Sequence, residues 1–277
     1  MGAKVKIDGI PALPFAMEEE MNRLRINVGF AGSKVKKILV ISTEPNEGKS
    51  FVAMHLWDHM GRLGNPSVLV DADLRKSVMI DHYKIRREDG KPIRGTSHYL
   101  AEDYSLEDAV LHTDIPGRDI LPNADEVINP AILIESDRFS EMLDELAGKY
   151  RYVFVDAPPL GLVSDGESIA AQCDGAILVV RSGVTSKKAV RTSLQQLERS
   201  GCRFLGFVLN RVGSSKDAYY KKGYGHYGKY GSYGAYGRYG SYGTREDKES
   251  SKDKTAGKGA AAGHGSRHKN KAKSRSK

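Results

Sequence analysis

Continuous runs of apolar, often β-branched residues recur through the first 212 positions, and polar segments separate them. The main runs are residues 38–42, 67–71, 152–156, 175–181 and 204–212. Runs that do not alternate with polar residues are typical of strands buried on both faces, as in parallel sheets. Because helical segments separate these strands, the pattern predicts an α/β fold, a three-layer α/β/α sandwich with a mostly parallel sheet and right-handed crossovers.

The segments between these runs show helical periodicity. In residues 17–30 and 51–63, apolar side chains recur at spacings of three and four, which predicts amphipathic helices. The first fifteen residues contain Gly9, Pro11 and Pro14 and are expected to form an extended arm. Further helices are predicted at residues 95–100, 105–111, 138–149 and 191–201 and from residue 165 onward, with a short strand at residues 119–121.

Composition changes abruptly after Gly213. Residues 219–243 hold nine of the 14 tyrosines in a Tyr-Gly-x repeat that contains no Leu, Ile or Val. Such a segment cannot bury enough apolar surface to offset the entropy of ordering it, so disorder is expected. The predicted organisation is an extended arm (1–16), a folded domain (17–213), a Tyr/Gly-rich tail (214–243) and a basic disordered tail (244–277).

Charge is distributed unevenly along the chain. The formal net charge is +8, but residues 214–277 hold 16 Lys and Arg against 5 Asp and Glu, so the folded part is slightly acidic. No apolar run approaches the ~18 residues that a membrane-spanning helix needs, and no signal-peptide pattern is present. These features predict a cytoplasmic protein that reaches a membrane through a partner. Cys173 and Cys202 lack metal-ligand spacing and are expected to be buried, reduced thiols.

A candidate phosphate-binding loop follows the first buried strand. It resembles G-x-x-x-x-G-K-[ST], although Thr43 stands where the first Gly belongs. Backbone N–H groups and a helix N-terminus would converge on one anion, with Lys49 on the β- and γ-phosphates and Ser50 on Mg²⁺. The alternative is a polar strand-to-helix turn with an exposed lysine. The residues assigned to nucleotide binding here are Thr43, Glu44, Pro45, Asn46, Glu47, Gly48, Lys49, Ser50 and Phe51.

Acidic residues end two further predicted strands. Asp71 and Asp73 follow one strand and Asp156 ends another. Ligands of open parallel sheets bind outside the carboxyl ends of the strands, so these acids and Lys49 should meet at one edge. Carboxylates beside a phosphate cradle are suited to binding Mg²⁺. A single acid in such a position is more often a turn residue or a helix cap.

Three segments carry a family resemblance. Residues 41–50, 68–76 and 153–159 resemble the Walker A, Walker A′ and Walker B motifs of bacterial tyrosine kinases of capsular and exopolysaccharide synthesis. That family shares its P-loop scaffold with the septum-site and plasmid-partition ATPases, and the similarity covers about residues 18–212. The resemblance implies binding of ATP and Mg²⁺ and an ATP-dependent protein-tyrosine kinase that autophosphorylates its C-terminal tyrosines in trans.

The resemblance also implies roles for single residues. Ser50, Asp71 and Asp156 are the expected metal-site residues, and Asp73 is the candidate to orient or deprotonate the tyrosine, although Asp71 and Asp73 could exchange roles. Arg75 completes the kinase-type Asp-x-Asp-x-Arg arrangement. At the end of the last strand, Asn210 is expected to touch adenine, with Arg211 beside it. A hydrogen bond from Asn210 to its own loop is the alternative.

The helix predicted at residues 17–30 resembles the family's subunit-contact helix, whose pattern is Glu-x-x-Arg-x-x-Arg. Glu19 and Arg25 fit this pattern, whereas Asn22 stands where the first Arg belongs and Arg23 is the possible substitute. The resemblance implies a homo-oligomer, for which a ring is one arrangement. The alternative is an ordinary amphipathic helix packed on its own domain.

The tail tyrosines are the expected acceptors. The other partners implied are a membrane adaptor of polysaccharide export whose cytoplasmic segment activates the kinase at the inner face of the plasma membrane, and a cognate tyrosine phosphatase. Tyrosine stacking and positive charge also suit nucleic acid, a less favoured alternative. A partition-type (MinD/ParA-like) ATPase with a DNA- or membrane-binding tail, and a nucleotide-gated scaffold, are the competing functions. The predicted phosphorylation sites are Tyr219, Tyr220, Tyr224, Tyr227, Tyr230, Tyr233, Tyr236, Tyr239 and Tyr242.

Overall fold

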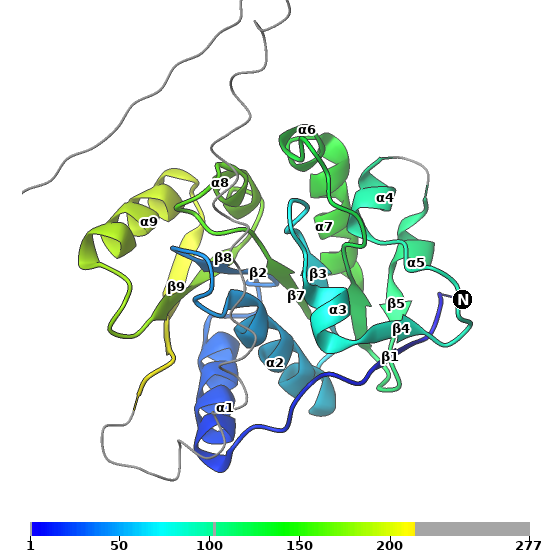
Figure 1. Cartoon of the computed structure of the whole chain (residues 1–277), viewed down its shortest axis with the longest axis horizontal. Helices are drawn as coiled ribbons and strands as arrows, with labels where there is room; N and C mark the ends of the chain where they lie inside the picture. The colour runs from blue at the N-terminus through cyan, green and yellow to red at the C-terminus, as the bar shows by residue number, and fades with distance from the viewer. Residues whose placement is uncertain (1, 102–103, 214–277) are drawn as a thin grey trace, which may run out of the picture. The chain divides into compact units, whose positions relative to one another are not determined.

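A seven-stranded sheet organises the described residues, which are 2–101 and 104–213 of a computed structural model (Figure 1). The strand order is β5-β6-β3-β7-β2-β8-β9, and every neighbouring pair is parallel except β5 and β6. The tyrosine repeat and the basic tail lie outside the described residues, so the predictions for them stay predictions. The strands are β2 (Lys37–Ser42), β3 (Ser67–Asp71), β5 (Leu111–His112), β6 (Arg118–Leu121), β7 (Tyr152–Asp156), β8 (Gly175–Arg181) and β9 (Arg203–Asn210).

Helices cover both faces of this sheet, so the predicted three-layer α/β/α sandwich is confirmed. Alternate residues of β2 enter different cores, with Ile38 and Val40 in the cluster beside α1 and α2, and Leu39 and Ile41 in the cluster beside α7, α8 and α9. Figure 1 shows α1 and α2 below the sheet and α7, α8 and α9 above it. These helices are α1 (Phe15–Phe30), α2 (Lys49–Arg62), α7 (Asp137–Lys149), α8 (Asp165–Ala170) and α9 (Lys187–Arg199).

Several short elements and boundaries differ from the expectations. The extended arm contains a short strand that was not predicted, since β1 (Val5–Ile7) pairs antiparallel with β4 (Ile85–Arg87). Helix α1 begins two residues earlier than predicted because the carbonyl of Pro14 already accepts the first helical hydrogen bonds. Helix α9 begins at Lys187 rather than residue 191 because Ser186 caps it. The remaining short helices are α3 (Met79–Tyr83), α4 (Thr96–Leu100), α5 (Leu106–Ala109) and α6 (Ala131–Ile134).

A buried ionic cluster joins α2 to β6. The Arg118 guanidinium donates a hydrogen bond to Asp58 and a second one, of 2.9 Å, to Asp114, and it lies 5.2 Å from the ring centroid of Trp57. Gly61 leaves room for this side chain, because a Cβ there would come within 2.6 Å of Arg118. The cluster therefore fixes α2, whose first turn belongs to the candidate site, against the sheet.

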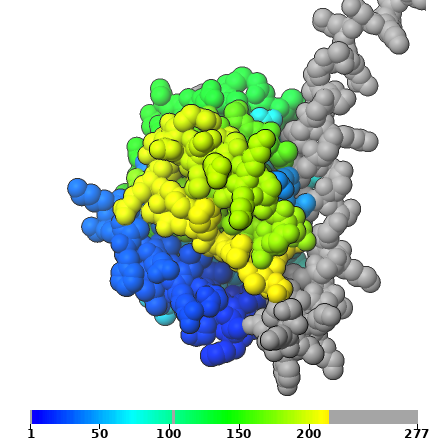
Figure 2. Space-filling view, turned by 90° about the vertical axis from the view of Figure 1, so that its left-hand side faces the viewer, coloured from blue at the N-terminus to red at the C-terminus, as the bar shows by residue number. Residues whose placement is uncertain are grey.

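Helix α1 and the edge strand β9 come together on the face shown in Figure 2, where α1 is blue and β9 is yellow. Arg203 donates a hydrogen bond of 3.1 Å to the carbonyl of Ala31, just after the end of α1. None of the helices within residues 2–101 and 104–213 combines the length and apolar content needed to cross a bilayer.

Candidate active site

The phosphate-loop segment joins β2 directly to the first turn of α2. Gly48 adopts a left-handed conformation with φ +95°, and a Cβ there would lie 2.1 Å from the Asn210 amide nitrogen. The following residue, Lys49, is the first of the 14-residue α2, whose first turn carries no acid. The N–H groups at a helix start favour an anion, so the local geometry suits a phosphate.

Glu47 holds the loop together from inside. Its carboxylate accepts the backbone N–H groups of Thr43 and Glu44, at 2.8 Å each. The other carboxylate oxygen accepts the N–H of Arg181, at 3.3 Å, and the hydroxyl of Thr185. The side chain of Glu47 is thus engaged within the protein, and the predicted contact from Glu47 to a nucleotide would have to come from its backbone.

Lys49 lies at the centre of the polar groups at this sheet edge. Its ammonium nitrogen is 3.3 Å from Asp73, 3.4 Å from Asp156 and 3.2 Å from the Ser50 hydroxyl. The Lys49 side chain is 12% exposed and both carboxylates are 3% exposed. The structure therefore brings the predicted loop lysine and the acids of two different strands into one buried cluster.

Asp71 lies beside Asp156, since the two residues are paired in register on β3 and β7. It accepts the N–H of Asp73, at 3.2 Å, and the hydroxyl of Ser77. Burial, and then the charge of Asp156, raise the pKa of Asp71 to about 8, against the hydrogen bond from Ser77. Burial also raises the pKa of Asp156, while Lys49 opposes that rise. A buried excess of carboxylates is stabilised by a cation.

The donor set fits Mg²⁺ better than a tightly caged metal. Among the described residues, no group of three or more His, Cys, Asp and Glu side chains is arranged to hold an ion alone. Mg²⁺ commonly uses one or two carboxylates and takes its other oxygens from water and phosphate. Ser50, Asp71 and Asp156 supply that kind of partial shell, and their assignment as metal residues stays a prediction.

Arg75 connects two loops of the site. Its guanidinium donates two hydrogen bonds to Asp165, at 2.5 and 2.9 Å, and the Asp165 side chain is 1% exposed. Such a two-pronged pair fixes both position and orientation. The segment after β3 is thereby tied to the start of α8, which follows β7, and the predicted contact of Arg75 with nucleotide stays a prediction.

Asn210 supports the phosphate loop from β9. Its amide nitrogen donates to the backbone oxygen of Glu47, at 2.8 Å, and its amide oxygen accepts the N–H of Arg211. The bond with Arg211 lies within the segment that follows β9, whereas the bond to Glu47 reaches the phosphate loop. Contact of Asn210 or Arg211 with adenine stays a prediction. Phe51, in the first turn of α2, packs against the ring of His55 with centroids 4.3 Å apart.

The predicted subunit-contact residues lie on α1. Glu19 is exposed, and Arg25 is partly buried with its Nε lacking a hydrogen-bond partner among the described residues. The same helix packs on its own domain through Met21 and Val28. Domain packing of α1 is therefore established here, and a role in assembly stays a prediction.

Sequence reasoning assigned no role to four residues that support the site. Ser77, Asp165 and Thr185 follow strands β3, β7 and β8, so the rule that ligands gather at the carboxyl ends could have included them. Tyr83, whose hydroxyl donates to the backbone oxygen of Ser50 at 3.4 Å, has no such signal.

The sheet, the loop and the clustered lysine and acids define the class of P-loop nucleotide-binding proteins, and solved structures agree. The kinase domain of the Escherichia coli tyrosine kinase ETK is 26% identical, with a TM-score of 0.62, over 72% of this chain and 78% of that one. The septum site-determining protein MinD of Pyrococcus horikoshii, complexed with Mg-ADP, is 28% identical, with a TM-score of 0.55, over 66% of this chain and 72% of that one. No family model matches the chain.

Two relatives of similar sequence narrow this class of P-loop proteins to one family. The tyrosine-protein kinase CpsD of Streptococcus agalactiae is 34% identical over 212 residues, which are 76% of this chain and 90% of the relative. CpsD of Streptococcus pneumoniae is 35% identical over 213 residues, 76% of this chain and 92% of the relative. The chain therefore belongs to the bacterial tyrosine kinase family, as the resemblance implied, and is a non-receptor protein-tyrosine kinase of P-loop type.

Proposed function

We propose that this kinase uses ATP and Mg²⁺ to phosphorylate the tyrosines of its own C-terminal tail in trans. The observation that carries the proposal is the position of Lys49 between Asp73 and Asp156 at the carboxyl edge of the sheet. This arrangement offers a positive charge for phosphate oxygens together with carboxylates for a metal and an incoming hydroxyl. Phosphoryl transfer depends mainly on such alignment and charge neutralisation.

Each residue has a role in this mechanism. Lys49 neutralises charge on the terminal phosphate, and the N–H groups at the start of α2 orient it. Ser50, Asp71 and Asp156 would hold Mg²⁺, which, when bound, neutralises charge that develops on the phosphate oxygens. Asp73 accepts the proton of the tyrosine hydroxyl as the tyrosine oxygen bonds to the γ-phosphorus and the bond to the β–γ bridging oxygen breaks.

The tail supplies the acceptor because it presents nine tyrosines in a segment without a core-forming pattern. Each phosphate adds about −1.5 to −2 charges, which opposes the positive charge of the tail and would weaken its return to the site. The wider role we propose is control of capsular or exopolysaccharide synthesis or export from the cytoplasm. There the kinase would be recruited to the inner membrane face by an adaptor, assembled as a homo-oligomer and reset by a tyrosine phosphatase.

Intact mass spectrometry tests the kinase proposal. We expect phosphate on residues 214–243 of the purified chain after incubation with Mg-ATP, and none on the Lys49→Met variant. Transfer in trans is tested by mixing the Lys49→Met chain with a chain whose nine tail tyrosines are Phe. Phosphate on the Lys49→Met chain is the expected result. ATP hydrolysis that DNA or lipid stimulates, without phosphotyrosine, would instead support the partition-type ATPase.

A further inference from the structure

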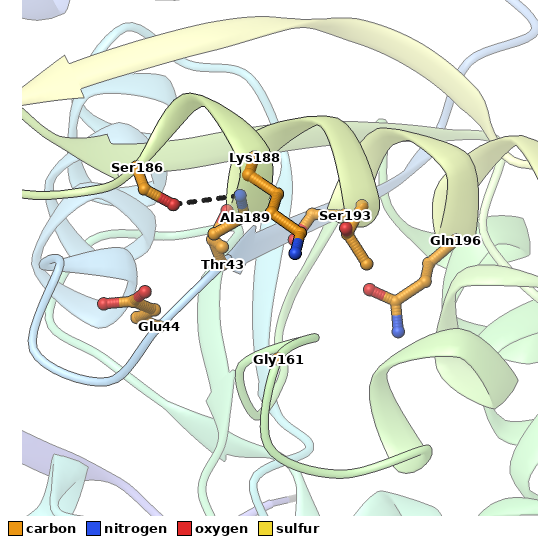
Figure 3. Close-up of a pocket in the computed structure, with 9 residues that line it drawn as sticks. Thr43, Glu44, Gly161, Ser186, Lys188, Ala189, Ser193 and Gln196 are labelled. Carbon is orange, nitrogen blue, oxygen red and sulfur yellow. Dashed lines mark hydrogen bonds between the residues drawn. The ribbon is translucent and has the colours of Figure 1, made fainter.

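A cavity of about 300 Å³ lies beside the start of the phosphate loop (Figure 3). Its walls are the first loop residues, Thr43 and Glu44, the backbone at Gly161 after β7, and one side of α9 from its cap to Gln196. Neither Lys49 nor the three acids beside it, Asp71, Asp73 and Asp156, line it. The volume is at the small end of ligand pockets, about 300 to 1,000 Å³, and suits one side chain better than a nucleotide. Helix α9 and its cap contribute Ser186, Lys188, Ala189, Thr192, Ser193 and Gln196.

Two wall residues have buried polar atoms with no partner among the described residues. The Thr43 hydroxyl is one, in a residue that is only 2% exposed. The Gln196 amide nitrogen donates to the carbonyl of Leu160, at 3.2 Å, and to Glu167, at 2.7 Å, which leaves the amide oxygen as the second unpaired atom. Buried polar groups are nearly always paired, so an occupant that both donates and accepts hydrogen bonds would complete this wall.

A phenol matches this wall. Its hydroxyl donates to the Gln196 oxygen and accepts from the Thr43 hydroxyl or from Lys188, whose side chain Figure 3 shows directed into the space. The small residues Ala189 and Gly161 leave room for a ring. The chemistry of this wall therefore suits the side chain of a tyrosine.

The backbone at Gly161 is held against the start of the phosphate loop at Thr43. Gly161 donates its N–H to the carbonyl of Thr43 at 2.9 Å, and a Cβ at Gly161 would lie 2.6 Å from that same oxygen. An occupant of the cavity therefore sits next to the start of the loop. In the Tyr-Gly-x tail, tyrosines three residues apart are separated by at most about 10 Å.

We propose that this cavity is a docking subsite for a non-reacting tyrosine of the tail, held while the neighbouring tyrosine of the repeat reaches the phosphate. The proposal rests on the proposed function, because it concerns the acceptor of that reaction. It makes the spacing of the repeat a specificity determinant: an acceptor with a second tyrosine three residues away binds better than one with a single tyrosine.

Peptides of residues 228–235, Gly-Lys-Tyr-Gly-Ser-Tyr-Gly-Ala, test this with the full chain as enzyme. Transfer to Tyr233 is compared for peptides with Tyr, Phe or Ala at Tyr230. We expect the KM to rise about tenfold with Ala, as when one anchoring side chain is lost, and less with Phe, at unchanged kcat. Equal KM values for the Tyr and Ala peptides would overturn the subsite.

Variants of the enzyme test whether the cavity causes the difference in KM between the peptides. Ala189→Leu fills the cavity, and Lys188→Ala removes a donor from it. Both should raise the KM of the Tyr230 peptide toward that of the Ala peptide, with the KM of MgATP unchanged. Lys187→Ala is the matched control, because it changes a lysine of the same turn that does not line the cavity. If Ala189→Leu or Lys188→Ala slowed transfer to the Tyr230 peptide and the Ala peptide equally, the assignment of the cavity as the docking subsite would be contradicted.

Direct binding separates this proposal from the kinase proposal. N-acetyl-tyrosine amide titrated into the full chain should shift the amide resonance of Ala189 at millimolar concentration, and Ala189→Leu should lose that shift. No shift in the wild-type chain would overturn the subsite. No transfer to any peptide, with the shift present, would contradict the kinase proposal and leave the subsite supported.

Discussion

Two steric features at position 48 require glycine. The φ angle there is +95°, and a Cβ would lie 2.1 Å from the amide nitrogen of Asn210. Gly48→Ala should therefore displace Asn210 and distort the loop. We expect at least a tenfold loss of phosphoryl transfer, and a stability loss of about 1–3 kcal/mol from the strained conformation. The measurements are phosphotyrosine formation and denaturant unfolding.

Gly64→Ala is the matched control for this change. Gly64 also has a positive φ, of +75°, but a Cβ there would meet nothing within 4 Å. The Gly64→Ala change should lower the free energy of unfolding by about 1 kcal/mol and leave phosphoryl transfer unchanged. Equal losses of transfer in the two variants would show that backbone strain alone, not contact with Asn210, explains the effect.

The buried side chain of His55 should make the stability of the fold depend on pH. Burial lowers the pKa of His55 from 6.5 to about 4, with Asp58 opposing and His59 adding to the shift. The unfolded chain therefore binds this proton first as the pH falls, and stability drops between pH 6.5 and 4. The loss from this group is up to about 3 kcal/mol. His55→Leu should flatten that part of the curve in denaturant unfolding, and parallel curves would contradict this.

At the scale of elements, the buried ion pair between α2 and β6 is the most sensitive contact. Asp58→Ala would leave Arg118, whose side chain is 5% exposed, without its buried partner. A loss of about 3–5 kcal/mol is expected, as for other buried charges deprived of a partner. Asp114→Ala removes a partner that is 84% exposed and should cost less than about 1 kcal/mol. Comparable losses in urea unfolding would be inconsistent with this difference.

The central strands were predictable because their apolar runs are continuous, and continuity reflects burial on both faces. Strands β1 and β4 were not, since each has three residues, and the exposed charges of Lys6 and Arg86 hide the pattern. Such short strands form only because a distant partner is present. The start of α9 was missed for a related reason, because the cap at Ser186 precedes the apolar periodicity.

The same reasoning explains what was predictable in the site. Lys49 and the acids could be found because each follows its own buried strand, and the topology brings strand ends together. The pair of Arg75 and Asp165 spans 90 residues, and the contacts of Glu47 to Thr185 span 138. No local pattern marks partners so far apart, so the internal use of the Glu47 carboxylate could not be foreseen.

At the scale of the whole molecule, α1 offers a test of assembly. Its buried side supports the domain through Met21 and Val28, whereas Phe15 and Phe30 are each 81% exposed. Glu19→Lys reverses a charge on the exposed side. It should weaken self-association in sedimentation experiments with nucleotide, without changing thermal stability, because its side chain is outside the core.

Glu145→Lys on α7 is the control for assembly, since Glu145 is also exposed and lies on a helix at the opposite face of the sheet. It should leave sedimentation unchanged. A wild-type chain that stays monomeric at high concentration with nucleotide would contradict the assembly proposal, and Glu19 would then belong to an ordinary solvent-facing surface.

The order of the strands also governs events on the ribosome. Strand β2, which leads into the phosphate loop, has β7 and β8 as its two neighbours, and both are translated more than 100 residues later. The nascent chain therefore cannot complete this centre until most of the body has emerged, and long-range pairing of this kind is slow. The tyrosine repeat is translated after every strand of the described residues, so all of the sheet has been synthesised before the acceptor segment is made.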